Sequence, residues 1–300
     1  LALIWGTNFL LVEEALEGLN PTQIVIIRLV SAGAILALLA GLQRIPLPKR
    51  GSVWTRLTVM GLIGQAIPWL LFAWGQQTVA SALAGVYTGL TPLLTIPVAS
   101  VLLRKQPTTA EVAASVVGFA GLAVVLAPWS ENSSASLVGQ LLCLVGAACY
   151  AVAYSYAAHI MKTVDESKLA LAASQALAAS AIMIPVGSGQ LMEPMHVTLP
   201  ITSCLILLGA GTAVAFLVNY WLIARVGPVQ ASLAFYLIPI VAAVVGILAK
   251  NERLSVNEVL GSVLILAALA ALYLRERRAP QPNDVEATEG LLPPLNSKVG

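Results

Sequence analysis

Polar and aromatic side chains recur at helical spacing inside long apolar stretches of this chain. Gln65, Trp69 and Phe72 follow one another at intervals of four and three residues, so they share one face of a helix. Further along, Phe216 and Asn219 repeat the pattern at an interval of three residues. A polar side chain is costly in hydrocarbon, so such a face points toward protein or water. We expect the two faces to form walls of one aromatic-lined cavity that binds a small organic molecule.

Other polar and aromatic residues within apolar stretches complete this predicted substrate-binding set. For any one of them, packing or hydrogen bonding between helices is the alternative role. The full set comprises Trp5, Asn8, Gln65, Trp69, Tyr87, Thr91, Tyr154, Asn219, Trp221 and Tyr236.

The stretches that carry these residues are long enough to cross a bilayer, whose hydrocarbon core of about 30 Å needs roughly 20 helical residues. The chain has 58% hydrophobic and 10% charged residues. Soluble domains carry about 25% charged residues, so the composition excludes a water-soluble fold. We expect an all-α integral membrane protein in the lipid bilayer, with ten transmembrane helices at residues 1–18, 22–41, 57–75, 80–103, 110–128, 136–158, 168–187, 201–223, 229–249 and 256–274.

The distribution of lysine and arginine predicts the orientation of these helices, because positively charged loops are retained in the cytoplasm. With the N-terminus inside, the outer loops carry only Lys250 and Arg253, whereas the other loop residues of this kind are cytoplasmic. The sequence therefore predicts a multi-pass protein of the cell (plasma or inner) membrane with both termini in the cytoplasm. The net charge of +2 is spread over short loops and does not indicate a nucleic-acid partner.

The two ends of the chain carry further expectations. Leu1 lies within an apolar run, so we expect residues to be missing before it. Residues 279–300 are polar and rich in proline, and this composition predicts a disordered cytoplasmic tail.

The two halves of the chain repeat each other at a constant offset of 147 residues, the distance from Pro92 to Pro239. The same offset pairs Trp74 with Trp221 and Glu111 with Glu258. Each half contains five predicted crossings, and since five is odd the second half enters the membrane upside down. Inverted repeats of this kind build secondary transporters with a site near the midplane. We expect two five-helix repeats, 1–128 and 136–275.

Pro92 and Pro239 occupy corresponding positions inside these repeats. A proline removes one helical hydrogen bond and frees the carbonyl four residues earlier, here that of Thr88 or Phe235. Free carbonyls at membrane depth are tolerated where they face protein or a water-filled cavity. Both prolines are therefore expected to break their helices beside the cavity, and a simple packing kink is the alternative.

Arg28 is the basic residue placed well inside an apolar segment. A central arginine costs about 2.5–3.5 kcal/mol on insertion scales, so it needs a partner. Glu13 and Glu14 end the preceding segment, and a short turn brings the two segments side by side. We expect a structural ion pair of Arg28 with Glu13 or Glu14. The alternatives are an arginine that attracts anions and a protonatable glutamate coupled to transport.

Several kinds of chemistry have no pattern to support them. The sequence contains no H-E-x-x-H motif and no Gly-rich phosphate loop. Its three cysteines form no C-x-x-C pair. We therefore expect no catalytic residues, no metal site and no cofactor, and we do not expect an enzyme.

Several motifs together resemble the EamA-type transporters of the drug/metabolite transporter superfamily. Residues 5–9 (WGTNF) are similar to the W-G-x-x-F signature that opens these proteins, and Arg28 stands where they place an arginine. Pro92 and Pro239 resemble the closing pattern of each repeat, and residues 251–255 (NERLS) resemble its G-E-x-L-T element. One departure is that Lys105 replaces the glutamate usual in the first repeat.

This resemblance implies a central cavity between two inverted halves and alternating-access transport of small solutes, often export of amino acids or related metabolites. Coupling to protons or to a counter-substrate is left open by it. The alternatives are a nucleotide-sugar or sugar-phosphate exchanger, which would need more basic residues in the cavity, and a non-transporting integral-membrane enzyme or lipid-handling protein.

Overall fold

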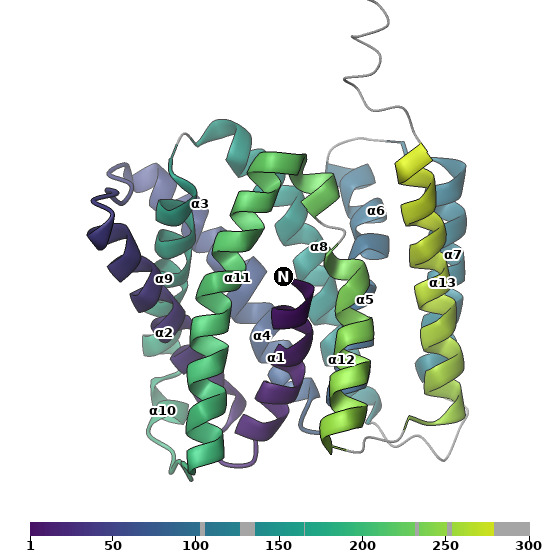
Figure 1. Cartoon of the computed structure of the whole chain (residues 1–300), viewed down its shortest axis with the longest axis horizontal. Coiled ribbons are helices and arrows are strands. Elements are labelled where there is room, and N and C mark those ends of the chain that lie inside the picture. The colour runs from purple at the N-terminus through teal and green to yellow at the C-terminus, as the bar shows by residue number, and fades with distance from the viewer. Residues whose placement is uncertain (103–105, 127–135, 165, 232–233, 251–253, 279–300) are drawn as a thin grey trace, which may run out of the picture.

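The computed structural model describes residues 1–102, 106–126, 136–164, 166–231, 234–250 and 254–278 (Figure 1). Every regular element in these residues is a helix, as expected for an all-α fold. The predicted tail at 279–300 lies outside the described residues. The elements are α1 (Ala2–Ala15), α2 (Pro21–Leu42), α3 (Gly51–Gly61), the π-helical turn η1 (Leu62–Ala66), α4 (Ile67–Gly75), α5 (Ser81–Gly89), α6 (Thr91–Leu102), α7 (Thr109–Leu126), α8 (Leu137–Thr163), α9 (Lys168–Val186), α10 (Ser188–Leu191), α11 (Leu199–Ala231), α12 (Ala234–Lys250) and α13 (Val256–Arg278).

Seven helical segments in the described part of the chain are long and apolar enough to cross a membrane. The remaining predicted crossings coincide with α1, α7 and α12, which are shorter or contain shorter apolar stretches. The chain thus has the helices of a multi-span membrane protein, and the number of ten crossings stays a prediction. The seven segments are Pro21–Leu42, Gly51–Gly75, Ser81–Val98, Leu137–Ala157, Lys168–Val186, Leu199–Leu222 and Val256–Arg275.

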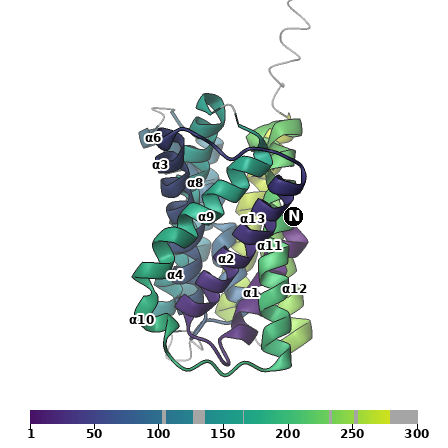
Figure 2. The same ribbon diagram turned by 90° about the vertical axis from the view of Figure 1, so that its left-hand side faces the viewer.

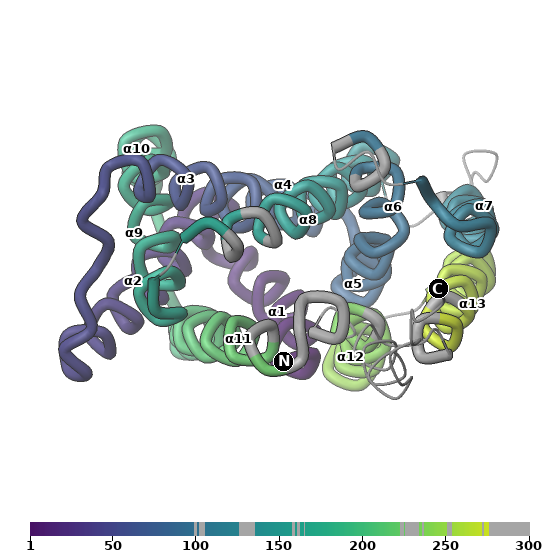
Figure 3. Tube along the Cα trace, turned by 90° about the horizontal axis from the view of Figure 1, so that it is seen from above, coloured from purple at the N-terminus to yellow at the C-terminus, as the bar shows by residue number. Residues whose placement is uncertain are grey.

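The helices stand side by side as a bundle (Figure 2). Seen along their axes, α1 lies near the middle beside α11 and α12, while α7 and α13 stand together at one end (Figure 3). Two apolar clusters flank the centre. One is built mainly by α2, α9 and α11, and the other by α5, α7, α12 and α13. Both α1 and α8 contribute side chains to each cluster, so these two helices join the two sides of the bundle.

Local sequence fixes the start of α2. Asn20 accepts a hydrogen bond from the Gln23 backbone N–H at 2.9 Å, and the Gln23 side chain accepts one from the Asn20 N–H at 2.9 Å. This reciprocal capping box, together with Pro21 in the first turn, defines where the chain turns from α1 into α2. The turn therefore sets the depth at which Arg28 enters the bundle.

The two expected proline breaks have different outcomes. The chain is interrupted at Leu90, between α5 and α6 and two residues before Pro92. At Pro239 the prediction is wrong, because α12 continues through this residue. Pro239 is the sixth residue of α12, so the helix accommodates the hydrogen bond that this proline removes. The Pro239 ring packs against Gly89 of α5.

Glycines allow α5 and α12 to approach closely. A Cβ atom added at Gly85 would overlap the Cβ of Ala242, and one added at Gly89 would overlap the Pro239 ring. An alanine methyl cannot rotate away, so the contact at Gly85 has no room for a side chain. The spacing of these two glycines is the small-residue pattern that brings membrane helices together.

We predict that Gly85→Ala lowers the thermal unfolding midpoint of the purified protein by several degrees. The reason is that overpacking a tight contact costs about 1–3 kcal/mol. Unfolding in detergent, followed by loss of the monodisperse peak on size exclusion, measures the change. Gly41→Ala in α2 is the matched control, since open space surrounds that position. Equal midpoints for the two variants would contradict the close approach of α5 and α12.

Candidate functional site

A cavity of about 100 Å³ lies between the helices. Its walls come from α1, α2, α4, α5, α8, α9, α11 and α12, with additional contacts from α3 and η1. Aromatic surface with a few polar groups suits a compact organic molecule. The aromatic and polar residues on the walls are Trp5, Asn8, Phe9, Arg28, Trp69, Phe72, Gln76, Thr88, Tyr150, Tyr154, Gln175, Phe216, Asn219, Tyr220 and Phe235.

The aromatic rings of the walls are packed against each other. Phe235 meets Trp5 at a centroid distance of 5.2 Å and meets Tyr154 edge-to-face at 4.9 Å. Phe72 stacks on Tyr150 with centroids 5.9 Å apart. Such pairs restrict ring rotation and add to the stability of the contact. The cavity therefore has apolar surfaces whose shape is held by contacts between helices.

Five members of the predicted binding set line this cavity: Trp5, Asn8, Trp69, Tyr154 and Asn219. They come from four different helices, α1, α4, α8 and α11. The structure thus brings together residues that lie up to 214 positions apart in the chain, from Trp5 to Asn219.

Other members of the set lie away from the cavity wall. The Tyr87 hydroxyl donates to Gln140 Oε1 at 2.6 Å, and the Thr91 hydroxyl lies 3.5 Å from the Ala147 carbonyl oxygen. Both contacts join helices to α8, which is the alternative role considered for them. The side chain of Tyr236 lies outside the described residues.

Trp221 points away from the cavity, and 52% of its surface is exposed. It lies two residues after Asn219, a step that turns a side chain about 200° around a helix. Its ring lies 5.1 Å from the guanidinium carbon of Arg225. Its placement in the binding set is therefore wrong, because one helix cannot direct both residues into the same cavity.

Arg28 projects into the centre of the bundle and is only 7% exposed. Its guanidinium carbon lies 3.8 Å from the centroid of the Trp69 ring, and Nε donates to Thr212 Oγ1 at 2.8 Å. With the Asn8 amide oriented to satisfy both of its neighbours, its oxygen accepts from Arg28 Nη2 at 2.7 Å and its nitrogen donates to the Ile4 carbonyl. The arginine is thus held by an aromatic face and two neutral acceptors.

The predicted ion pair of Arg28 with Glu13 or Glu14 is absent from the described residues. The capped turn explains why: α1 ends at Ala15 and α2 begins at Pro21, and the helices run in opposite directions. Arg28, two turns into α2, is therefore level with Asn8 rather than with the end of α1. The partner of Arg28 is therefore set by how far along α2 the arginine lies. The adjacency of α1 and α2 alone does not give this depth.

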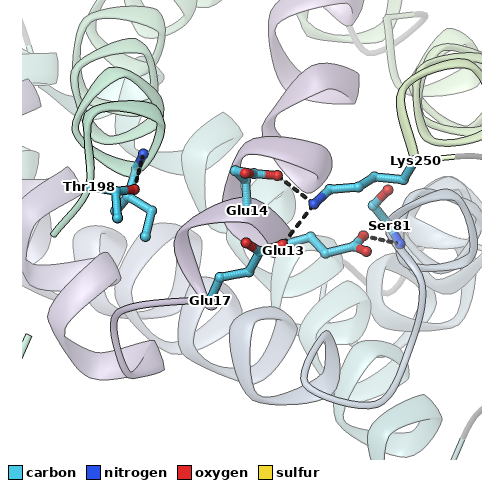
Figure 4. Close-up of polar contacts among 7 residues, drawn as sticks. Glu13, Glu14, Glu17, Ser81, Thr198 and Lys250 are labelled. Atoms are coloured by element: carbon cyan, nitrogen blue, oxygen red, sulfur yellow. Dashed lines mark hydrogen bonds and ion pairs between the residues drawn. The ribbon is translucent and has the colours of Figure 1, made fainter. Parts of the chain in front are cut away.

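The acidic residues instead connect the end of α1 to two other helices (Figure 4). Lys250, the last residue of α12, places Nζ 2.5 Å from Glu14 Oε2 and 2.8 Å from Glu17 Oε1. Glu13 accepts a hydrogen bond from the Ser81 backbone N–H at 3.0 Å. Its negative charge there also interacts favourably with the positive end of the α5 helix dipole. We call Glu13, Glu14, Glu17, Ser81 and Lys250 the polar latch.

Gln175 and Tyr220 line the cavity and were absent from the predicted set. The Tyr220 hydroxyl donates to Gln175 Oε1 at 2.7 Å, joining α11 to α9. Tyr220 lies four residues after Phe216 and so shares its helix face, a signal present in the sequence. Gln175 is a single amide within an alanine-rich stretch, and no periodic pattern marks it.

Gln65 lies within η1, where the Ile67 N–H reaches the Leu62 carbonyl five residues earlier. The side chain is 1% exposed, and neither Oε1 nor Nε2 has a hydrogen-bond partner among the described residues. Its neighbour Gly64 lines the cavity, whereas Gln65 is not among the residues of the wall. Pro68 follows immediately, and π-helical turns are frequent at functional sites in proteins.

Comparison with known proteins identifies the family. The model of the EamA-like transporter family matches residues 1–127 and again residues 137–274. The chain belongs to this family. PecM of Dickeya dadantii is 24% identical over 270 residues, covering 89% of this chain and 87% of PecM. YedA of Escherichia coli, named as an uncharacterized inner membrane transporter, is 24% identical over 279 residues, covering 91% of this chain and 88% of YedA.

A third relative has a more specific name. The probable terminal-alkyne amino-acid exporter of Streptantibioticus cattleyicolor is 22% identical over 272 residues, covering 90% of each chain. A protein of known crystal structure matches this chain with a TM-score of 0.64 at 22% identity, covering 92% of this chain and 95% of that one. At this identity the structural match shows a shared fold alone.

We predict that Gln175→Met lowers the stability of the protein and that Gln65→Met does not. Gln65 carries a buried amide without partners among the described residues, so its removal leaves the free energy of unfolding unchanged or raises it. Gln175→Met leaves the buried Tyr220 hydroxyl without its acceptor, which costs about 1–3 kcal/mol. Thermal unfolding of the two purified variants measures the difference. A loss of stability in Gln65→Met as large as in Gln175→Met would show that the Gln65 amide is satisfied in the folded protein.

Proposed function

We propose that this EamA-family protein is a secondary transporter that exports a small organic metabolite, such as an amino acid or a related compound, by alternating access. The observation that carries the proposal is that both family matches build the same cavity. Residues 1–127 supply Trp5, Asn8 and Trp69, and residues 137–274 supply Tyr154 and Asn219. A site shared by two repeats is reached from alternate sides when the repeats rock against each other.

The helix contacts support an inverted repeat with ten crossings. Under the sequence offset, α7 corresponds to α13, and α5 together with α6 corresponds to residues 228–249, which include most of α12. α7 packs against α13, and α5 packs against α12. The contact of α4 with α8 has its counterpart in that of α11 with α1. Exchanging the halves therefore reproduces the pattern of contacts, as a twofold axis relating repeats 1–128 and 136–275 would require. We propose that both termini lie in the cytoplasm.

The amino-acid part of the proposal rests on the site and on one relative. The cavity combines aromatic surface with an arginine and four side-chain amides, Asn8, Gln76, Gln175 and Asn219, which can meet a polar head group beside an apolar body. The name of the relative from Streptantibioticus cattleyicolor describes it as a probable terminal-alkyne amino-acid exporter. The proposal assigns no coupling ion and no counter-substrate.

Two other functions are supported less well. A nucleotide-sugar or sugar-phosphate exchanger would need several basic groups to meet phosphate. Among the described residues on the cavity wall, Arg28 is the basic residue. A membrane enzyme or lipid-handling protein would not need a site divided between two repeats.

The polar latch supports alternating access, because it joins α1 of one repeat to α12 of the other. The ion pairs lie at the ends of these helices, and the Glu14 and Lys250 side chains are each about a quarter exposed. Exposed ion pairs contribute only about 0.2–1 kcal/mol each, so they form and break readily. We propose that the latch closes the outer end of the cavity and opens during each cycle.

The transport proposal predicts saturable flux into proteoliposomes for at least one solute in a labelled pool of amino acids, purines and sugars, with and without a pH gradient. The Trp5→Ala/Asn219→Ala double variant should reduce this flux by about tenfold or more, since each tenfold loss corresponds to about 1.4 kcal/mol of binding. Trp221→Ala is the matched control and should leave flux unchanged, because its ring lies outside the cavity. Equal losses in both variants, or no flux of any solute from folded and inserted protein, would count against the proposal.

The latch proposal predicts that Lys250→Gln opens the outer end of the cavity more often. In a background lacking the native cysteines, Val12→Cys on the cavity wall should react about two to five times faster with an external, impermeant maleimide, as expected from the loss of about 0.4–1 kcal/mol. Lys168→Gln, at the start of α9, is the control and should not change the rate. An unchanged rate in Lys250→Gln would show that the latch does not control access.

A further inference from the structure

The arginine in the cavity has hydrogen-bonding capacity that the described residues do not use. A guanidinium group has five N–H donors. Nε is used by Thr212 and Nη2 by Asn8, whereas no hydrogen bond joins Nη1 to a described residue. Arg28 lines the cavity, so a ligand that enters this space comes next to its side chain.

The charge of Arg28 is also not balanced within the cavity. Among the described residues on the wall there is no aspartate or glutamate. Glu14 forms an ion pair with Lys250, and Glu13 accepts from the α5 N-terminus. A buried charge is normally paired, and the electrostatic effect of an unpaired one is strong because water is excluded. The site therefore favours entry of one negative charge.

The surroundings of Arg28 hold it in an orientation suited to an anion. The guanidinium carbon of Arg28 lies over the Trp69 ring, 3.8 Å from the ring centroid. Stacking uses the face of the planar group and leaves its edge, which carries the N–H donors, available for bonds in the plane. Thr212 and Asn8 fix the rotation of the group from two helices. This pre-organisation suits the planar, bidentate geometry of a carboxylate.

Resting on the transport role proposed above, we propose that Arg28 binds the carboxylate of the transported solute, so that the cavity selects compounds with a single carboxylate and an apolar body. The apolar body would lie against the packed rings of Trp5, Tyr154 and Phe235. Arg28 is the basic residue among the described residues of the wall, so it can pair with one carboxylate of the solute. A second anionic group on the solute would have no basic partner there. Thr212 is a positioning residue in this account, because it acts on the solute through Arg28.

A purely structural role for Arg28 is the competing explanation. In that case the stacking on Trp69 and the bonds to Thr212 and Asn8 would be its whole purpose, and carboxylate and non-carboxylate ligands would bind equally. The two explanations differ in ligand preference rather than in stability, and the test therefore compares ligands that are matched except for the carboxylate.

The experiment measures binding to the purified full chain in nanodiscs, by tryptophan fluorescence and by the shift of the thermal unfolding midpoint. The probe pairs are 3-phenylpropionate with 3-phenylpropanol, phenylalanine with phenylalaninol, and leucine with leucinol. We expect at least one carboxylate to bind about tenfold or more tightly than its matched alcohol, a difference of about 1.4 kcal/mol. We expect Arg28→Gln to reduce this ratio to about twofold or less, mainly by weakening carboxylate binding.

Further variants keep the test decisive if Arg28→Gln folds poorly. Thr212→Val removes one of the contacts that orient Arg28 while retaining the charge, and it should lower the carboxylate ratio severalfold without changing alcohol binding. Arg225→Gln is the matched control, since it removes an arginine that also lies over a tryptophan ring but faces away from the cavity, and it should leave the ratio unchanged.

The outcomes separate this inference from the transport proposal. No carboxylate preference in any pair, or a preference that survives both Arg28→Gln and Thr212→Val, overturns the inference. Flux of a neutral or cationic solute without carboxylate preference overturns it while supporting transport. Carboxylate binding that depends on Arg28, without flux of the bound compound in proteoliposomes, supports the inference and counts against transport.

Discussion

The cost of placing a positive charge inside a membrane protein is the constraint on which the centre of this structure depends. Arg28 is almost fully buried, yet no carboxylate of the described residues compensates it. Its position is maintained by an aromatic face and two neutral oxygen atoms from three other helices. Those helices must therefore keep a fixed depth and rotation relative to α2, and the packing around the cavity supplies that constraint.

Depth is set at the capped turn between α1 and α2, and rotation is set by close contacts between the two halves. The capping box begins α2 at a defined residue, which places Arg28 level with Asn8. The glycine contacts of α5 with α12 fix these helices at short range. The centre is thus positioned by a local turn and by long-range packing, with the polar latch at the end where α1, α5 and α12 meet.

Much of this arrangement could be predicted from residue types and spacing. Helical periodicity and the cost of polar groups in hydrocarbon identified Trp5, Asn8, Trp69, Tyr154 and Asn219, which line one cavity. The predictions that went wrong needed information that periodicity lacks. The partner of Arg28 depended on depth along two antiparallel helices, and a single lost hydrogen bond at Pro239 did not interrupt α12. Trp221 was placed in the binding set, although it lies on the opposite face of α11 from Asn219.

The π-helical turn at Leu62–Ala66 has a consequence for how insertions and deletions would act on this site. A π turn accommodates one more residue than the α-helical turn it replaces, and so shifts the register of the residues after it by about 100°. Met60 before the turn, Gly64 within it and Trp69 beyond it all line the cavity. Deleting one residue from the turn would restore a regular helix but would rotate Trp69 relative to them, away from Arg28. Inserting or deleting one residue in this turn would thus rotate the part of the cavity wall that follows it.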